Sequence, residues 1–195
     1  MPEPPALTGL TVSGDLGAWV AAGFALDDGG SLRLGSVRVR TADTPGAEGI
    51  VAWSLTEVED GVVDGLLTLA PDHTPRPAAV AHPNTTTAID HLVVASPDLD
   101  RTTEAFGAVG LELRRVRDAG RMEQRFFRIG EAILELIGRP GATGAGPATF
   151  WGLALTVADI DAAATLLGDH LGPVTDAVQP GRRIATLRDE AVGVP

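Results

Sequence analysis

The stretch IDHLVVASPDLDRT, residues 89–102, decides the fold predicted for this chain. It opens with apolar and β-branched residues, which are typical of a buried strand. Ser96 offers a capping hydroxyl, and Pro97 and Asp98 both suit the start of a helix. Apolar residues then recur at helical spacing as far as Gly110, which is placed to end the helix. The stretch therefore predicts a strand that leads directly into a helix.

Three further strands are predicted after this helix, over residues 111–117, 123–129 and 131–137. The last two are short, largely apolar runs that meet at Gly130, where a tight turn can join them. Residues 88–138 thus form a complete β-α-β-β-β unit. This combination of several strands with one helix predicts the α+β class.

Parts of this pattern recur elsewhere in the chain, which indicates tandem units. The segments LTGLTVSGDL (residues 7–16) and FWGLALTVADI (150–160) each contain an apolar strand followed by Asp-Leu or Asp-Ile at the start of a helix. In the second of these segments the helix is predicted to end at Gly172. The segment LRLGSVRVR (32–40) matches FRIGEAILE (127–135) position for position.

The repeats divide the chain into three parts. We predict a degenerate N-terminal copy over residues 1–70, a proline-rich linker over 71–87 and a pair of β-α-β-β-β units over 88–195. Residues 50–58 open a partial further copy in the N-terminal part, and residues 183–187 are predicted as a strand of the last unit.

Composition and charge exclude several classes of function. The net charge of −11 makes nucleic acid an unfavourable partner, because its phosphate backbone would be repelled. The chain has no cysteine, which excludes thiolate nucleophiles and thiolate metal sites. The longest apolar run, residues 16–26, is too short to cross a bilayer. The N-terminus shows no signal-peptide pattern, so we expect a cytoplasmic protein without a membrane partner.

The segments IDHLVVASPDLDRT, RFFRIGEAILELIG (125–138) and FWGLALTVADID (150–161) together resemble the vicinal oxygen chelate superfamily. This superfamily includes glyoxalases, extradiol dioxygenases and bleomycin-resistance proteins. The resemblance implies tandem β-α-β-β-β units that curl into a half-open barrel around a small-molecule pocket. It also implies metal ligands on the first and fourth strands of each unit.

On this resemblance, His91 and Glu135 occupy ligand positions and are the expected catalytic pair. The matching positions elsewhere are Gly152, Gly9 and Arg40, none of which is a plausible metal ligand. Half of the metal site of the family is therefore expected. The cofactor that the resemblance implies is a divalent ion such as Zn, Ni, Mn or Fe.

The residues themselves favour the same location. Strand side chains alternate between faces, so His91 shares a face with Val93, and Glu135 shares one with Ile133 and Ile137. A carboxylate between two isoleucines is costly unless it is paired or bound to a metal. Two explanations stay open: metal binding, and a buried pair of His91 and Glu135 joined by one hydrogen bond.

Other side chains are expected to contact a ligand. Trp151 stands where a pocket could use an aromatic wall, and Arg183 follows a glycine turn at the expected rim; Gln124 is the third predicted contact. Six arginines in residues 111–130 could attract a carboxylate or a phosphate. The simpler explanation for them is the solvated face of a sheet.

The remaining histidines and tryptophans are expected to be structural. His73 and His82 lie in the proline-rich stretch, where turns are favoured, and His170 lies near a helix C-terminus. Trp19 and Trp53 are expected in the core, which aromatic side chains commonly dominate.

Three hypotheses for function follow. The first is a glyoxalase-like enzyme of isomerase or lyase type, with or without metal assistance. The second is a metal-free protein that binds or sequesters a small molecule in the same pocket, as bleomycin-resistance proteins do. The third is a structural module that forms a homodimer. The sequence does not identify the substrate.

Overall fold

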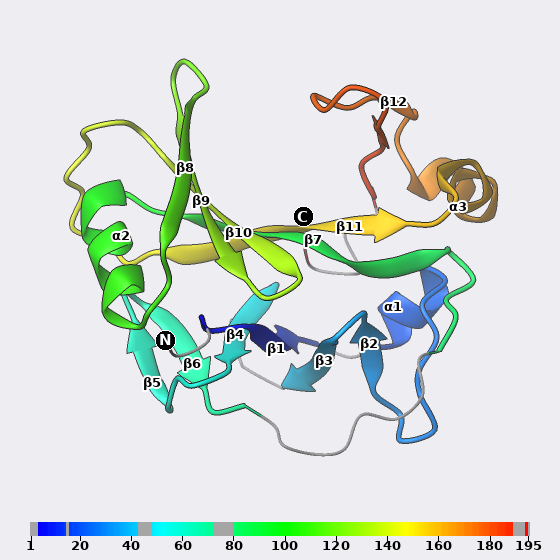
Figure 1. The fold of residues 1–195 in the computed structure, drawn as a ribbon. Helices are drawn as coiled ribbons and strands as arrows, with labels where there is room; N and C mark the ends of the chain where they lie inside the picture. Colours follow the sequence, from blue (N-terminus) through cyan, green and yellow to red (C-terminus); the bar gives the residue numbers. More distant parts are fainter. Residues whose placement is uncertain (1–3, 15, 43–47, 72–79, 189–193, 195) are drawn as a thin grey trace.

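The computed structural model describes residues 4–14, 16–42, 48–71, 80–188 and 194, and it contains two large sheets that pack on each other (Figure 1). His73 and part of the predicted linker lie outside the described residues. The N-terminal sheet has the strand order β2-β3-β1-β4-β6-β5. Its elements are β1 (Leu7–Ser13), α1 (Gly17–Ala21), β2 (Leu32–Leu34), β3 (Val37–Ala42), β4 (Ile50–Leu55), β5 (Gly61–Val63) and β6 (Leu66–Leu69).

The C-terminal sheet has the strand order β11-β7-β10-β9-β8, and a separate two-stranded sheet joins β12 to β13. The elements here are β7 (Thr86–Ala95), α2 (Leu99–Ala108), β8 (Leu113–Asp118), β9 (Glu123–Ile129), β10 (Ala132–Gly138), β11 (Thr149–Val157), α3 (Ile160–Leu167), a 3-10 turn (Gly168–His170), β12 (Thr175–Asp176) and β13 (Arg183–Ile184). The α+β class and the β-α-β-β-β unit are confirmed. The sheets curl but do not close into a barrel (Figure 1).

Several predicted boundaries were wrong by a few residues. Strand β7 begins at Thr86, inside the predicted linker. Helix α2 is capped by Asp98 and not by Ser96, because the Asp98 carboxylate accepts the backbone N–H of Arg101 at 3.0 Å. Helix α3 ends before Gly168, whose φ of 53° leaves the helical region, so Gly172 does not end it. The strand predicted over 183–187 shrinks to the two residues of β13.

The two sheets repeat one pairing scheme. Strand β1 pairs with β3 in parallel and with β4 antiparallel, just as β7 pairs with β10 in parallel and with β11 antiparallel. The registers also correspond. Thr11 lies opposite Arg40 in the N-terminal sheet, and Val93 lies opposite Glu135 in the C-terminal sheet. Strands β4 and β6 form another parallel pair, so the N-terminal sheet itself contains two reduced copies.

The core lies between the sheets and is rich in aromatic side chains. Trp53 of β4 contacts Phe106 of α2 at 5.9 Å and Phe150 of β11 at 5.7 Å between ring centroids. Phe106 also contacts Phe127 of β9 at 5.2 Å. Trp53 and Trp19 are almost fully buried, which confirms their predicted core role. None of the described helices is long and apolar enough to cross a membrane.

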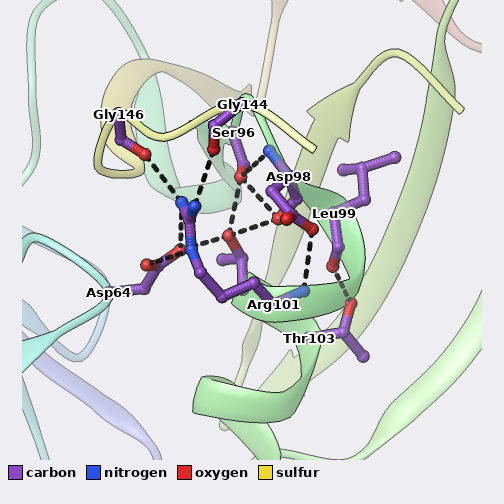
Figure 2. A network of polar contacts seen from close by, with 9 residues as sticks. Asp64, Ser96, Asp98, Leu99, Arg101, Thr103, Gly144 and Gly146 are labelled. Atoms are coloured by element: carbon purple, nitrogen blue, oxygen red, sulfur yellow. Dashed lines mark hydrogen bonds and ion pairs between the residues drawn. The ribbon is translucent and has the colours of Figure 1, made fainter. Parts of the chain in front are cut away.

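Polar contacts also join the sheets. The turn between β5 and β6 places Asp64 against helix α2, where its carboxylate accepts Nε of Arg101 at 2.8 Å (Figure 2). The same guanidinium donates to the carbonyls of Gly144 and Gly146. On another side, His82 accepts the N–H of Ala25 at Nδ1 (3.0 Å), and its Nε2 lies 2.7 Å from the carbonyl of Arg33. The structural role predicted for His82 is confirmed.

Candidate functional site

The candidate site lies on the outer face of the C-terminal sheet, which is turned away from the N-terminal sheet. The β8–β9 hairpin and the β12–β13 segment both rise on this side (Figure 1). Pairing register arranges the side chains of this face in rows across the strands. The first row is Arg128, Ile133, His91 and Ala154; the second is Arg115, Phe126, Glu135, Val93 and Gly152; the third is Arg117, Gln124, Ile137, Ala95 and Thr149. His91 and Glu135 thus occupy adjacent rows on neighbouring strands.

His91 is held by a carboxylate that alternation alone would place on the other face. Its Nδ1 lies 2.6 Å from Oδ2 of Asp90. Strand β7 carries an extra residue here, because Ile89 and His91 pair with consecutive residues of β11. This bulge allows Asp90 and His91 to meet on one side of the sheet. Simple alternation along the strand therefore does not predict Asp90 at the site.

The other nitrogen of His91 is open. Within the described part of the chain, no residue forms a hydrogen bond with Nε2, and the side chain keeps 18% of its exposure. The ring lies 6.3 Å from that of Phe126 in an edge arrangement. Arg182, from the turn before β13, reaches Oδ1 of Asp90 at 3.4 Å. Arg182, Asp90 and His91 therefore form a chain of polar contacts.

Glu135 and Gln124 form the second polar pair of this face. The Nε2 of Gln124 donates to Oε1 of Glu135 at 2.6 Å. This bond fixes the direction of the amide, since an ionised carboxylate can only accept. The amide oxygen of Gln124 is then buried, and it has no partner among the described residues. A buried acceptor of this kind is normally satisfied, so a ligand or water donor is expected beside it.

An open groove crosses the same face toward the β8–β9 hairpin. Its volume is about 430 Å³, and it is lined by Arg114, Phe126, Phe127, Arg128 and Ile133. Arg114 is the extra residue of a bulge in β8, since Leu113 and Arg115 pair with consecutive residues of β9. The groove thus combines an apolar floor with guanidinium groups at its edge.

Arg183 and Trp151, the other two predicted ligand contacts, lie in different surroundings. Arg183 forms two 2.8 Å bonds to the carboxylate of Asp161 at the start of α3, which raise the pKa of Arg183 and lower that of Asp161. It is the neighbouring Arg182 that extends to the site. Trp151 is the extra residue of a bulge beside Gly152, and 55% of it is exposed.

A divalent metal would need more ligands than the described residues bring together. His91 offers Nε2, and Glu135 offers the oxygen that Gln124 does not occupy, whereas catalytic zinc sites usually have three protein ligands. In the described ranges, no three His, Asp or Glu side chains are grouped to hold a metal. These residues do not fit a metal centre.

Comparisons with known proteins agree with this architecture. A fusion protein of a xylose isomerase-like TIM barrel and 4-hydroxyphenylpyruvate dioxygenase is 16% identical, with a TM-score of 0.57; the match covers 89% of this chain and 40% of the fusion protein. A mutant of 4-hydroxymandelate synthase from Streptomyces coelicolor is 17% identical, with a TM-score of 0.55 and coverage of 87% and 75%. At such identities these likenesses show the fold alone.

Sequence comparison supplies the family. No curated protein matches the chain. The family model described as the Glyoxalase/Bleomycin resistance protein/Dioxygenase superfamily matches residues 88–189. This match takes in the C-terminal sheet except the first two residues of β7, and it includes the candidate site, so the predicted resemblance is confirmed. The chain therefore belongs to the Glyoxalase/Bleomycin resistance protein/Dioxygenase superfamily.

Proposed function

We propose that the outer face of the C-terminal sheet binds a small carbonyl compound and that His91 moves a proton on it. The protein would then be a glyoxalase-like enzyme of isomerase or lyase type. The observation that carries this proposal is the 2.6 Å contact between Nδ1 of His91 and Asp90, with Nε2 open. A histidine oriented by a carboxylate at one nitrogen is a common arrangement for a general base.

The pairing fixes the chemistry of the imidazole. With Nδ1 2.6 Å from Asp90, a neutral His91 would carry its proton on Nδ1, which leaves the lone pair on Nε2 for a substrate hydrogen. When Nε2 takes that proton, the adjacent Asp90 stabilises the imidazolium. Phe126 supplies an apolar wall beside the ring. The proton is returned to a different atom of the substrate in an isomerisation, or passed to a leaving group in an elimination.

The pair of Glu135 and Gln124 gives this base a neighbour that positions the ligand. The carboxylate oxygen of Glu135 that Gln124 does not occupy can accept a hydroxyl or N–H of the substrate. Glu135 lies one row from His91 and is only partly buried, so its carboxylate can serve as a second proton carrier. Two titratable groups on one face allow a proton to leave one side of a carbon and return at another atom.

The test is hydrogen–deuterium exchange at the α-carbon of carbonyl compounds in heavy water, followed by proton NMR. Phenylpyruvate, oxaloacetate and an acetoacetyl thioester form a first panel. We expect exchange above the uncatalysed rate with at least one compound, and its loss in His91→Gln. His170→Gln, on the exposed 3-10 turn, is the matched control. Exchange that is equally fast in His91→Gln would contradict the proposal.

A second candidate is binding without chemistry. The apolar floor of the groove, made by the side chains of Phe126 and Ile133, favours it, because such a surface retains ligands regardless of proton transfer. The two functions separate in the same samples. Panel compounds that shift the NMR signals of this face, yet never exchange a hydrogen, would identify a binding protein.

A further inference from the structure

We infer that the natural ligand of this face carries an anionic group, a carboxylate or a phosphate. In this arrangement Arg128, which has no ion-pair partner among the described residues, binds the anion, and an apolar part of the ligand lies on Phe126 and Ile133. The inference rests on the proposed function in one respect, since it assumes that the ligand also reaches His91. It identifies the chemical class of the substrate, which the arrangement of Asp90 and His91 alone does not identify.

The first support is the distribution of charge. Residues 111–130 carry six arginines and three acidic residues in a chain whose net charge is −11. Two of these arginines are neutralised locally, Arg125 by Glu123 and Asp100, and Arg114 by Glu112. Arg128, Arg115 and Arg117 have no ion-pair partner in the described ranges. In a chain so rich in acids, a group of unpaired guanidiniums on one face is unexpected.

The second support is the placement of these arginines. Arg128, Arg115 and Arg117 each occupy the β9 or β8 end of one row of the site face. Arg128 and Arg114 also line the open groove of about 430 Å³. An ordinary solvated face explains exposed arginines, but not their position at the rim of a groove with an apolar floor.

The third support is the distance to the proposed base. Arg128, Ile133 and His91 lie in one row on three successive strands, so Arg128 and His91 are roughly 10 Å apart between Cα atoms. A ligand with an acidic group at one end and a reactive carbon at the other can span this row. A guanidinium binds carboxylate and phosphate oxygens through two parallel hydrogen bonds, which would also fix the orientation of the ligand.

The experiment uses three probes that share one ring: phenylacetate, phenyl phosphate and benzyl alcohol. Binding is followed by amide shifts in ¹H–¹⁵N spectra of the full chain. We expect at least one anion to shift residues 126–128 and 133 in a saturable manner, with benzyl alcohol about tenfold weaker or more. The anion that binds more tightly identifies the headgroup. Absence of a saturable shift with both anions would overturn the inference.

Variants separate a specific contact from bulk charge. Arg128→Gln should weaken binding of the preferred anion about tenfold and leave benzyl alcohol unchanged, whereas Arg128→Lys should retain part of the affinity. Arg121→Gln removes the same charge at the tip of the hairpin and is the matched control. Equal losses in Arg128→Gln and Arg121→Gln would overturn the inference. Thermal unfolding of each variant confirms that the exposed substitutions leave the fold intact.

The same probes distinguish this inference from the proposed function. His91→Gln should still bind the anion, because the anion contacts lie on β8 and β9. Deuterium exchange without any preference for anionic compounds would refute the anion site and leave His91 as the base. Anion binding without exchange would refute proton transfer and leave the anion site in place.

Discussion

At the scale of single residues, the contact between Asp90 and His91 makes a prediction about the tautomer of the ring. In the neutral form of the ring, Nδ1 of His91 should carry the proton, and Nε2 should appear as an unprotonated nitrogen in ¹⁵N spectra. Asp90→Asn should change this tautomer balance, because an amide can donate to Nδ1 as well as accept from it. Any proton-transfer activity should fall by about 100-fold or more.

The control for this prediction is Asp161→Asn, which removes an exposed carboxylate of the same chain that binds Arg183. It should leave the spectrum of His91 and any exchange activity unchanged. An identical His91 spectrum in Asp90→Asn and the parent protein would show that Asp90 does not orient the ring.

Asp27 gives a pH dependence at the same scale. The N–H of Ser31 lowers the pKa of Asp27 below its ordinary value of 3.8, with further help from Gly29 and Arg33. A carboxyl group with a lowered folded pKa stabilises the protein at higher pH and loses that contribution as the pH falls through the folded value. Asp27→Asn should therefore lower the free energy of unfolding at pH 7, and the difference from the parent protein should begin to shrink near pH 3.8 and be lost as the pH falls through the lower folded pKa.

Urea unfolding at a series of pH values measures this effect. Asp28→Asn alters the exposed neighbouring carboxylate and should have little effect at any pH. A stability difference between Asp27→Asn and the parent protein that is independent of pH would show that hydrogen-bond geometry, and not charge, explains the contribution of Asp27.

At the scale of elements, the turn between β5 and β6 shows why a glycine is required. Gly65 has a φ of 96°, and an added Cβ would lie 2.2 Å from Cβ of Pro147. Gly65→Ala should therefore lower the free energy of unfolding by backbone strain and by displacement of the segment before β11. Gly120→Ala is the matched control, since Gly120 has a φ of 80° with open space around it.

The difference between these two variants isolates the packing contribution. Both variants place an alanine in a left-handed backbone conformation, but only Gly65→Ala also creates a clash with Pro147. Gly65→Ala should therefore be more destabilising by about 1–3 kcal/mol. Urea unfolding measures it. Equal stabilities would mean that the turn does not pack tightly against Pro147.

Most of these elements follow from local sequence, and the exceptions have a common cause. The strand–helix–strand order of 88–138 is predictable because apolar periodicity, Asp98 and the turn glycines all agree. The site is less predictable, because three bulges move Asp90, Arg114 and Trp151 out of simple alternation. A bulge is a property of pairing between strands, and a single strand sequence does not record it. Arg182 reaches the site because of the way the last unit folds. The sequence of that unit does not predict this contact.

At the scale of the whole molecule, the two sheets have one pairing scheme but different outer faces. His91 and Glu135 in the C-terminal sheet correspond in register to Gly9 and Arg40 in the N-terminal sheet. The N-terminal sheet therefore lacks the proposed base and the carboxylate beside it. What it contributes is the opposite wall of the core and the Asp64 contact to helix α2. We infer that it supports the site without forming part of it.

Because the N-terminal sheet supports the site on the C-terminal sheet, we predict that the two sheets unfold together. Trp53 belongs to the N-terminal sheet, yet it packs against Phe106 and Phe150, which belong to the C-terminal unit. Trp53→Ala removes a fully buried side chain from that boundary and should lower the free energy of unfolding by about 3–5 kcal/mol. Val62→Ala, at an exposed position on the edge strand β5 of the same sheet, should change it by less than about 0.5 kcal/mol.

Two spectroscopic signals test whether Trp53→Ala lowers the stability of both sheets. Tryptophan fluorescence of a Trp151→Phe background follows Trp19 and Trp53 of the N-terminal sheet, and the NMR signal of His91 follows the outer face of the C-terminal sheet. Because one continuous core joins the sheets, both signals should change at the same urea concentration in the parent protein and shift together in Trp53→Ala. If the His91 transition stayed in place while the fluorescence transition moved, the C-terminal unit would be stable by itself. The N-terminal sheet would then have no role in holding the site.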